Sequence, residues 1–420
     1  MKRRASLWWE NDFLTKRRGK LYLGARSAEE VARKHGTPLF CYGRDRIKAN
    51  YQRLKKVFDF SREGFEVRLS YAMKANPNRG ILKTLRSEDA WIDAVSPAEV
   101  EEARAAGFPS DRILYTGTSV SREDLERVMA VEGLVLNIDA LEQLDIMRDV
   151  ARQGAPRRAV RVSIRWNPGI GGGFNPKVVT AGKTTPSGIP IKFGLDESKV
   201  LAAFQKAVAL GFKPVGLHQH LGSGWVKEDF KAVRAAVEKM VKKAAQLERD
   251  GFDLEFLDFG GGFGPRYRPD QKVFPLERYA ALIRRTVTRA GLGVRTVCVE
   301  PGRFLVADAG VLLIRVEYVK ESYGQFFACV NAGTFNSVAR PAIYTEASHP
   351  ILNASRLAAG AKKRLTVAGN LCESADVFGK NILLPLPRTG DILAVLLAGA
   401  YCRSMASHFN LREIPPEILL

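Results

Sequence analysis

The fold is first indicated by the stretch Leu69-Ser-Tyr-Ala-Met-Lys74-Ala-Asn-Pro-Asn78. Leu69, Tyr71 and Met73 alternate with smaller residues, as in a buried strand, and Pro77 would end such a strand. A lysine at the end of a buried strand lies at the edge of a core, where desolvation favours the neutral amine and where it can form a Schiff base. Taken alone, the segment is explained more simply by one surface lysine among 65 basic residues.

Eight strand-like runs, of which this is the first, alternate with helical patterns. The runs are Arg68–Met73, Trp91–Val95, Arg112–Tyr115, Leu134–Ile138, Val160–Trp166, Pro214–His218, Leu254–Phe259 and Arg295–Val299. The helical patterns between them include Pro97–Ala106, Ala140–Arg152, Lys227–Arg249 and Leu276–Ala290. Such alternation implies parallel strands joined by helical crossovers, and eight strands predict an α/β fold with a (β/α)8 TIM-like barrel.

The pattern changes after about residue 305, where strand-like runs are separated by glycine and proline turns. The runs at 311–319, 326–330, 364–367 and 391–396 predict a mainly β C-terminal domain, residues 306–420, after a barrel that spans residues 37–305. We expect residues 1–36 to pack with the β domain. The glycine-rich segment Gly169–Lys192 is expected to be a loop over the mouth of the barrel.

The composition, 46% hydrophobic and 26% charged, is that of a globular protein. No apolar run approaches the roughly 18 residues of a membrane span, and the first residues lack the apolar stretch of a signal peptide. The five cysteines form no Cys-x-x-Cys pair, so neither a disulfide framework nor a zinc ribbon is indicated. We therefore expect a cytoplasmic protein without a membrane partner.

The formal net charge of +20 raises the question of a nucleic-acid partner. The basic residues are scattered, however, and no basic run exceeds three residues, as at Lys2-Arg-Arg4 and Lys16-Arg-Arg18. No recognised nucleic-acid-binding module is present either. The charge is best explained as a solvated surface, and no nucleic-acid partner is expected.

The unusual polar residues fall at the carboxyl ends of the predicted strands, where barrel enzymes have their active sites. Lys74 ends the first strand, and the second carries Asp93. The other segments are Arg165-Trp-Asn-Pro168, His218-Gln-His220-Leu-Gly-Ser223, Asp258-Phe-Gly260-Gly-Gly-Phe-Gly264 and Glu300-Pro-Gly-Arg303. We expect these groups to lie together around one ligand.

Each group also has a simpler explanation. The glycines at 260–264 could form a flexible turn, although backbone N–H groups between a strand and a helix also bind phosphate. His218 and His220 share a strand face and could bind a metal, but no third ligand of suitable spacing appears, so no metal is predicted and stacking on a flat ring is favoured. Glu300 and Arg303 could form a structural ion pair, or Glu300 could face a heteroaromatic nitrogen.

An imine-forming lysine, two phosphate-binding turns, a stacking histidine and a carboxylate for a ring nitrogen together indicate pyridoxal 5'-phosphate. In this interpretation, Gly222-Ser223 is the second phosphate-binding turn. A ring nitrogen kept protonated by a carboxylate favours carbanion chemistry, hence a decarboxylase or an enzyme of another carbanion reaction.

The same residues resemble a known family. Tyr71-Ala-Met-Lys-Ala-Asn, His218-x-His-Leu-Gly-Ser, Gly260-Gly-Gly-Phe-Gly, Glu300-Pro-Gly-Arg, Arg340-Pro-x-x-Tyr344, Cys372-Glu-Ser and Gly399-Ala-Tyr-Cys-Arg-Ser-Met-Ala-Ser407 resemble motifs of the diaminopimelate decarboxylases, which are fold-type III pyridoxal phosphate decarboxylases. The similarity runs from about Leu21 to the C-terminus and keeps the motif order. It implies an alanine-racemase-like barrel with a β domain, and conversion of meso-2,6-diaminopimelate to L-lysine and CO2.

The resemblance also implies roles for single residues. The implied catalytic residues are Lys74, His220 and Cys372, the last as the proton donor. The implied cofactor-binding residues are Lys74, Asp93, Arg165, His220, Ser223, Gly260, Gly261, Gly262, Glu300, Gly302, Arg303 and Tyr401. The implied substrate-binding residues are Arg303, Arg340, Tyr344, Glu373 and Tyr401. In this family Cys372 and its neighbours reach the site from the other subunit, which implies an obligate homodimer with shared active sites.

The chain departs from the family pattern at a few positions. Thr116-Gly-Thr-Ser-Val120 replaces a common Gly-Asn-Lys pattern, Ala375 stands where glycine is usual, and Asn370 stands where proline is common. A paralogue acting on a D-lysine-like or D-ornithine-like amino acid, or on a siderophore or secondary-metabolite intermediate, would fit these departures. A racemase is disfavoured by Glu300, because racemases of this fold place arginine at the ring nitrogen. A non-catalytic homologue is disfavoured because Lys74, Cys372 and Glu373 are all present.

Overall fold

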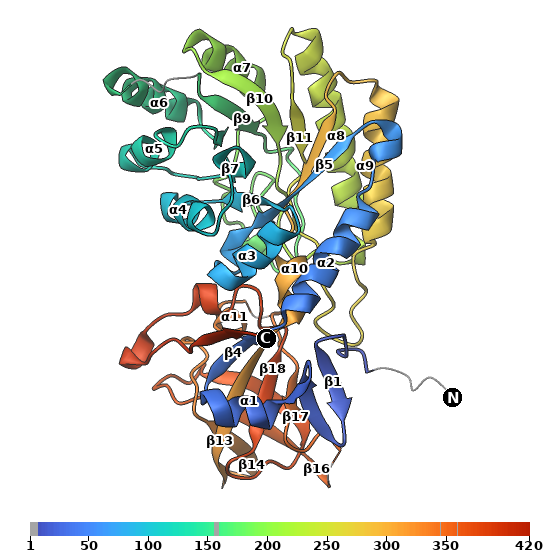
Figure 1. Ribbon diagram of the computed structural model, residues 1–420, viewed down its shortest axis with the longest axis vertical. Coiled ribbons are helices and arrows are strands. Elements are labelled where there is room, and N and C mark those ends of the chain that lie inside the picture. The colour runs from blue at the N-terminus through green and yellow to red at the C-terminus, as the bar shows by residue number, and fades with distance from the viewer. Residues whose placement is uncertain (1–6, 155–158, 345, 359) are drawn as a thin grey trace. The chain divides into compact units, whose positions relative to one another are not determined.

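A computed structural model describes residues 7–154, 159–344, 346–358 and 360–420 of the chain (Figure 1). The basic run at residues 2–4, and the first part of the segment in which no signal peptide is expected, lie outside the described residues. The chain divides into two compact units. The barrel unit comprises Tyr51–Gly264 and Lys272–Gly302, and the sheet unit comprises Met1–Asn50, Pro265–Gln271 and Arg303–Leu420.

The barrel unit confirms the predicted (β/α)8 barrel. Its eight strands are β5 (Glu66–Ala72), β6 (Trp91–Ala94), β7 (Ile113–Tyr115), β8 (Val135–Ile138), β9 (Arg161–Arg165), β10 (Lys213–His218), β11 (Phe256–Asp258) and β12 (Thr296–Val299). Neighbouring strands pair in parallel, and β12 pairs with β5 to close the barrel. Each strand corresponds to one of the eight apolar runs in the sequence, so the carboxyl ends of all eight meet at one end of the barrel.

The crossover helices lie around the outside of these strands (Figure 1). They are α3 (Arg79–Ser87), α4 (Pro97–Ala105), α5 (Arg122–Met129), α6 (Leu141–Gln153), α7 (Val200–Ala209), α8 (Phe230–Arg249) and α9 (Leu276–Ala290), and α2 (Arg44–Val57) begins in the sheet unit. Local sequence fixes their starts. Asn78 caps α3 by accepting hydrogen bonds from the N–H groups of Gly80 and Ile81, and Ser96 caps α4 in front of Pro97.

Side chains from five of the barrel strands, β7, β8, β10, β11 and β12, pack against one another. Leu114, Val135, Val215, Phe256 and Cys298 form this buried cluster. The ring of Phe256 occupies the space that a Cβ at Gly216 of β10 would need, so a glycine is required at that position.

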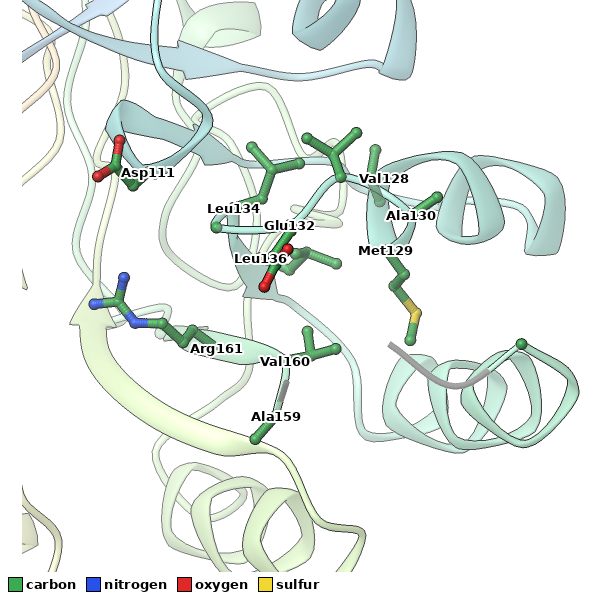
Figure 2. Close-up of a pocket in the computed structure, with 13 residues that line it drawn as sticks. Asp111, Val128, Met129, Ala130, Glu132, Leu134, Leu136, Ala159, Val160 and Arg161 are labelled. Atoms are coloured by element: carbon green, nitrogen blue, oxygen red, sulfur yellow. The ribbon is translucent and has the colours of Figure 1, made fainter. Parts of the chain in front are cut away.

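A cavity of about 510 Å³ lies where β8 and β9 begin (Figure 2). Asp111, Leu134, Val160 and Arg161 are among the residues that line it. Because the strands are parallel, this cavity is at the end of the barrel opposite to Lys74.

The segment Gly169–Lys192 is almost entirely irregular, as expected, with one short 3₁₀ turn, η4 (Pro176–Val178). It packs on the chain that follows β10: Gly172 N–H donates to the Leu221 carbonyl at 3.1 Å, and Phe174 N–H donates to the Ser223 carbonyl at 3.2 Å. The loop therefore covers residues at the carboxyl end of the barrel.

The sheet unit contains the strands predicted for the C-terminal part of the chain and several more. In the order β15-β18-β13-β14-β16-β17, the sheet consists of β15 (Ile351–Asn353), β18 (Ile392–Leu396), β13 (Gly310–Ser322), β14 (Gln325–Val330), β16 (Lys362–Ala368) and β17 (Val377–Pro385). Two further strands, β4 (Leu39–Tyr42) and β19 (Glu417–Leu419), pair in parallel, and β4 also pairs with β13. The strand β4 thus belongs to this sheet, although it precedes the barrel strands in the sequence.

The first residues of the described chain also belong to the sheet unit. A small antiparallel sheet of β1 (Leu14–Arg17), β2 (Lys20–Leu23) and β3 (Arg26–Ser27) leads into α1 (Ala28–His35). Ser27 and Glu30 form a reciprocal capping box at the start of α1. Leu21, Val31, Val311 and Leu313 are members of one buried cluster, so this N-terminal segment packs on β13.

Two short helices, α10 (Arg303–Val306) and α11 (Arg340–Ile343), begin with two of the arginines for which binding roles were predicted. Among the described residues, no helix combines the length and the apolar character needed to cross a bilayer.

Candidate active site

The structure brings together the polar residues that were predicted at the strand ends of the barrel. Arg165, His218 and Asp258 are aligned across β9, β10 and β11, since Arg165 pairs with His218 and His218 pairs with Asp258. Asp93 on β6 is paired with Ala72, the last residue of β5. Parallel register therefore places these side chains in one row at the carboxyl end.

Lys74 lies in a tight turn, η2 (Met73–Ala75), directly after β5. The turn is held by Tyr71, whose hydroxyl donates to the Asn76 carbonyl at 2.9 Å, and by Asn76 N–H, which donates to the Met73 carbonyl at 3.0 Å. The Lys74 Nζ is 2.8 Å from Oδ2 of Asp93, a residue with no exposed surface. A buried carboxylate next to a partly exposed amine fixes the direction in which the amine points.

Asp93 has a second oxygen, Oδ1, that is buried and has no hydrogen-bond partner among the described residues. A buried carboxylate oxygen in this state is costly, because its desolvation is not compensated. The orphaned oxygen next to Lys74 is a polar feature that a bound ligand or water would satisfy.

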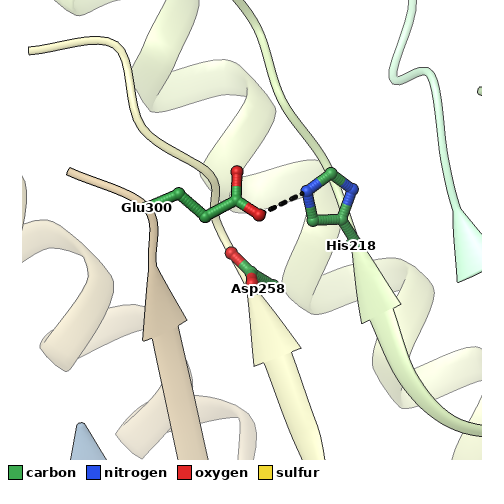
Figure 3. A group of neighbouring side chains, drawn as sticks. All are labelled: His218, Asp258 and Glu300. Atoms are coloured by element: carbon green, nitrogen blue, oxygen red, sulfur yellow. Dashed lines mark hydrogen bonds and ion pairs between the residues drawn. The ribbon is translucent and has the colours of Figure 1, made fainter. Parts of the chain in front are cut away.

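Glu300, just after β12, forms a buried network with His218 and Asp258 (Figure 3). Glu300 Oε1 is 3.1 Å from Nε2 of His218, and one ligand atom from each of the three residues lies within 4.8 Å of the others. Burial alone would raise the pKa of Glu300, but the hydrogen bonds and charges of His218 and His220 hold it well below its ordinary value. Glu300 is therefore an ionised carboxylate in a buried site, and His218 donates to it.

The pKa of Asp258 is shifted in the direction opposite to that of Glu300. Burial, followed by the charge of Glu300, raises the pKa of Asp258 well above its ordinary value, although its Oδ1 accepts a hydrogen bond from Gly260 N–H at 2.8 Å. Two carboxyl groups this close do not both ionise easily, so a shared proton is favoured on Asp258 and the negative charge on Glu300. The sequence spacing showed no third ligand-type residue beside the two histidines. In the structure, Asp258 and Glu300 come close to His218 from the neighbouring strand ends.

His220 follows β10 and faces the glycine loop after β11. The N–H of Gly261 donates to Nδ1 of His220 at 3.2 Å, and Oε2 of Glu300 lies 3.5 Å from the same nitrogen. Burial lowers the pKa of His220 and so favours the neutral ring, although the hydrogen bond and the charge of Glu300 oppose this effect. A neutral imidazole held at its edge in this way leaves its flat face for packing against a ring.

The glycine loop fits a phosphate or another anion that approaches the backbone closely. A Cβ at Gly260 would lie 2.5 Å from the Gln219 carbonyl oxygen, and one at Gly261 would overlap the Glu300 carbonyl. Gly260 and Gly262 also have positive φ angles of 66° and 124°. Side chains are thus excluded from this turn by both space and conformation, which is typical of a backbone cradle.

The second predicted turn, Gly222-Ser223, has the same property. Gly222 has φ 139°, and a Cβ there would overlap the Gly172 carbonyl of the long loop. Gly224 N–H donates to the Gly262 carbonyl at 2.7 Å, so the two glycine turns are directly linked. Gly302 is also tightly placed, because a Cβ there would be 3.2 Å from Ala72 and Ala75, on either side of Lys74.

Arg165 is buried at the end of β9, and its guanidinium lies 4.7 Å from the centre of the Phe193 ring. Burial lowers the pKa of Arg165, and the carboxylates of Glu300 and Asp139 oppose that effect. A buried cation near these carboxylates is consistent with a role in binding a polar group at the barrel mouth.

The other predicted binding residues belong to the sheet unit, where Arg303, Arg340 and Tyr401 are grouped around Tyr267. The Arg303 guanidinium lies 4.7 Å from the Tyr401 ring centre, and its Nη1 donates to the Tyr267 hydroxyl at 3.1 Å. Tyr401 has φ 55°, a strained conformation for a residue other than glycine. Such strain is found at binding sites more often than elsewhere, which supports a functional position for Tyr401.

Cys372 and Glu373 lie in the loop between β16 and β17 and are exposed. The loop is shaped by buried Asp376, whose Oδ1 accepts from Thr334 N–H at 2.6 Å and from its hydroxyl at 2.8 Å, and whose Oδ2 accepts from Leu371 N–H at 2.7 Å. Cys372 N–H donates to Asn410 Oδ1 at 2.8 Å. The other four cysteines are buried, as packing residues would be.

Sequence reasoning missed several residues that the structure makes part of these clusters. Asp258 was noticed only as the start of a glycine loop, and His218 only as a metal or packing residue. Tyr267, His349 and Asp376 were not noticed. They have no motif of their own, and each becomes visible only through partners that are distant in the sequence.

Comparison with known proteins agrees with this geometry. Residues 44–307 match the family described as pyridoxal-dependent decarboxylase, pyridoxal binding domain. The chain is 39% identical over 408 residues to a diaminopimelate decarboxylase of Methanothermobacter thermautotrophicus, covering 96% of this chain and 91% of that protein. It is 31% identical over 413 residues to the enzyme of that name from Aquifex aeolicus, covering 98% and 93%.

Solved structures are similar over the same length. The diaminopimelate decarboxylase of M. jannaschii in complex with L-lysine superimposes with a TM-score of 0.88 at 31% identity, covering 98% of this chain and 93% of that chain. The Helicobacter pylori enzyme with L-lysine has a TM-score of 0.84 at 33% identity, covering 93% of each chain. A lysine beside a buried ionised carboxylate and a glycine cradle is an arrangement that fits pyridoxal 5'-phosphate. The chain therefore belongs to the family of pyridoxal-dependent amino-acid decarboxylases.

Proposed function

We propose that the protein decarboxylates meso-2,6-diaminopimelate at its D-configured centre, giving L-lysine and CO2 in lysine biosynthesis. The observation that carries the proposal is the near full-length similarity to several proteins named diaminopimelate decarboxylase, two of them solved with L-lysine bound. The two buried arginines of the sheet unit support it, since a substrate with a second amino-acid end offers a second carboxylate.

The residues of the barrel unit suit the cofactor. Lys74 is the amine that would bind its aldehyde, Glu300 is the carboxylate for its ring nitrogen, and His220 offers a flat face for its ring. The glycines of the cradle, with Ser223 and Gly302, would bind its phosphate, and Asp93 and Arg165 would orient the groups around Lys74. When bound, pyridoxal phosphate withdraws electrons from the bond that breaks. The protein supplies an ionised Glu300, which His218 orients and which Asp258 does not neutralise.

The residues of the sheet unit suit substrate recognition and proton return. Arg303 and Arg340 would bind carboxylate, with Tyr344 and Tyr401 beside them, and Glu373 would bind the distal ammonium. Cys372 would donate a proton to the carbon that has lost CO2.

We also propose that the protein is a homodimer in which Cys372 and Glu373 complete the partner's site. Both residues are exposed in the single chain. A proton donor in an active site is normally shielded from water, so a second subunit would be needed to cover them. The same surface carries Phe409 and Leu411, which are 43% and 96% exposed, next to Asn410, the residue bonded to Cys372. Exposed apolar side chains around a functional loop are typical of an interface.

Shared sites have a specific test. Lys74→Ala and Cys372→Ala proteins should each be inactive or nearly so, but after denaturation together and refolding they should recover about a quarter of wild-type activity, because half of the dimers then contain one intact site. Recovery that stays at the level of the separate variants would exclude sharing.

The function itself is tested by CO2 release from a panel comprising meso-, LL- and DD-diaminopimelate, D- and L-lysine, D- and L-ornithine, and arginine. Preference for meso-diaminopimelate, with a visible absorption band that is lost in Lys74→Ala, is the expected result. Preference for D-lysine or D-ornithine would identify the paralogue that the departures at Thr116–Val120 and Ala375 leave open. Protein that binds no pyridoxal phosphate would contradict the proposal as a whole.

A further inference from the structure

His349 of the sheet unit is held as a single tautomer. Its Nδ1 lies 2.9 Å from the Leu396 carbonyl oxygen, and its Nε2 lies 2.9 Å from Nη1 of Arg340. A carbonyl can only accept and a guanidinium can only donate, so Nδ1 carries the proton and Nε2 accepts from Arg340. Burial, and then the charge of Arg340, lower the pKa of His349 to about 3, so this acceptor is available throughout the ordinary pH range.

Tyr267 contacts both arginines of the sheet unit. Its ring centre lies 4.9 Å from the Arg340 guanidinium and 5.7 Å from that of Arg303, and its hydroxyl accepts from Arg303. The imidazole of His349 meets the same ring edge-on, with centroids 5.7 Å apart. One aromatic side chain thus connects the two cations and the histidine.

Two buried guanidinium groups close together repel each other. Arg340 is 2% exposed and Arg303 5%, and burial followed by the charge of Arg303 lowers the pKa of Arg340. The face of an aromatic ring and a neutral nitrogen acceptor both stabilise a cation without neutralising it. The Tyr267 ring and the His349 nitrogen therefore stabilise the two guanidinium groups without neutralising their charge.

The orientation of Arg340 is also fixed. A guanidinium binds a carboxylate best through two parallel N–H groups in one plane, so rotation of that plane removes one of the two bonds. His349 holds one end of the Arg340 fork, and the Tyr267 ring sits against the guanidinium. Such preorganisation improves binding because less freedom is lost when the ligand arrives.

We propose that His349 and Tyr267 are positioning residues that set the plane of Arg340, and through it the preference for a substrate with a second carboxylate. The inference rests on the proposed function and deepens it, because it names the residues that decide between diaminopimelate and amino acids with one carboxylate. His349 acts through Arg340 and does not itself contact the substrate.

The test compares two substitutions of one residue. His349→Phe keeps the ring and its edge contact with Tyr267 but cannot accept from Arg340, whereas His349→Gln places an amide oxygen where Nε2 was. The substrates are meso-diaminopimelate and D-lysine, which is the same molecule without the second carboxylate. The ratio of kcat/KM for the two substrates should fall about tenfold or more in His349→Phe, through the KM for diaminopimelate, and recover most of its value in His349→Gln.

Equal losses for both substrates, or an unchanged ratio in His349→Phe, would overturn the proposal, because a merely structural role does not distinguish them. A second test measures binding without turnover. Calorimetry gives the affinity for pimelate, an unreactive dicarboxylate with the same carbon chain as diaminopimelate. The holoenzyme should bind pimelate more tightly than hexanoate, and His349→Phe should remove most of that difference. If wild-type protein binds both ligands equally well, the positioning role of His349 and Tyr267 is refuted, even where diaminopimelate is decarboxylated. If pimelate binds more tightly but diaminopimelate is not decarboxylated, the proposed function is refuted instead.

Discussion

Lowering the pH should decrease the free energy of unfolding, because the buried His349 of the sheet unit is neutral in the folded protein. In the folded protein, the pKa of His349 is lowered to about 3 from an ordinary value of 6.5, because the ring is buried next to Arg340. Below the ordinary pKa the unfolded chain therefore binds a proton at this position that the folded chain does not bind. Stability contributed by the neutral ring is complete above about pH 6.5 and is lost progressively as the pH falls toward 3.

The size of the effect follows from the difference in pKa. Each pH unit between the two values changes the free energy of unfolding by about 1.4 kcal/mol for one group. Between pH 7 and pH 5, His349 should account for a loss of about 2 kcal/mol, because only the part below pH 6.5 counts fully. In His349→Gln this group is absent, so the same acidification should cost about 2 kcal/mol less than in wild-type protein.

Urea unfolding followed by tryptophan fluorescence, at pH 7 and pH 5 and at one protein concentration, measures both values. The comparison of wild type with His349→Gln cancels the other titrating groups, including His220 and the carboxylates, which are present in both proteins. Identical pH dependence in the two proteins would refute the reasoning, because it would mean that His349 takes up its proton in the folded state as easily as in the unfolded chain.

Three further changes test other parts of the site. Cys372→Ala should lower turnover by roughly 10²-fold or more while the absorption of bound cofactor stays unchanged, and loss of both would indicate a structural role. Asp376→Asn should lower the free energy of unfolding, measured in urea, by about 2 kcal/mol. The reason is that the new amide group then faces one of the three N–H and O–H donors that the carboxylate accepts from. A change below about 0.5 kcal/mol would contradict the loop's dependence on this carboxylate. Gly261→Ala should weaken cofactor binding to apoprotein at least tenfold by displacing the Glu300 carbonyl, whereas Gly293→Ala, where a Cβ meets nothing closer than 3.5 Å, should not.

The barrel strands could be predicted because a parallel strand buried on both faces is a nearly continuous apolar run, bounded by turn residues. The strand β17 was not predicted, and its sequence explains why. Gly379 and Asn381 interrupt the alternation, Asn381 has φ 52°, and the pairing of β17 with β16 shifts register. The three-residue strand β15 is too short for a periodic signal.

The barrel part of the site could be predicted because strand ends meet in a barrel wherever they occur in the sequence. The two positioning residues of the sheet unit could not. Tyr267 lies in Pro265–Gln271, which follows a barrel strand but packs with the sheet unit, and its partner His349 is more than 80 positions away. No local period or spacing connects such residues, so their proximity becomes known only from the fold.

The charges of the two units are arranged for different tasks. The barrel unit groups three carboxyl residues, Asp93, Asp258 and Glu300, with an amine and a histidine pair. The pKa of Asp258 is raised, whereas that of Glu300 is lowered. The sheet unit groups two cations around one neutral ring. In the proposed function, reaction chemistry depends on the first arrangement and substrate choice on the second. Because Arg340 contacts His349 and Tyr267 within its own unit, we expect substitutions there to change which amino acid is accepted without altering the protonation of Glu300. A relative with a different substrate should therefore differ first around Arg340, and retain the barrel network unchanged.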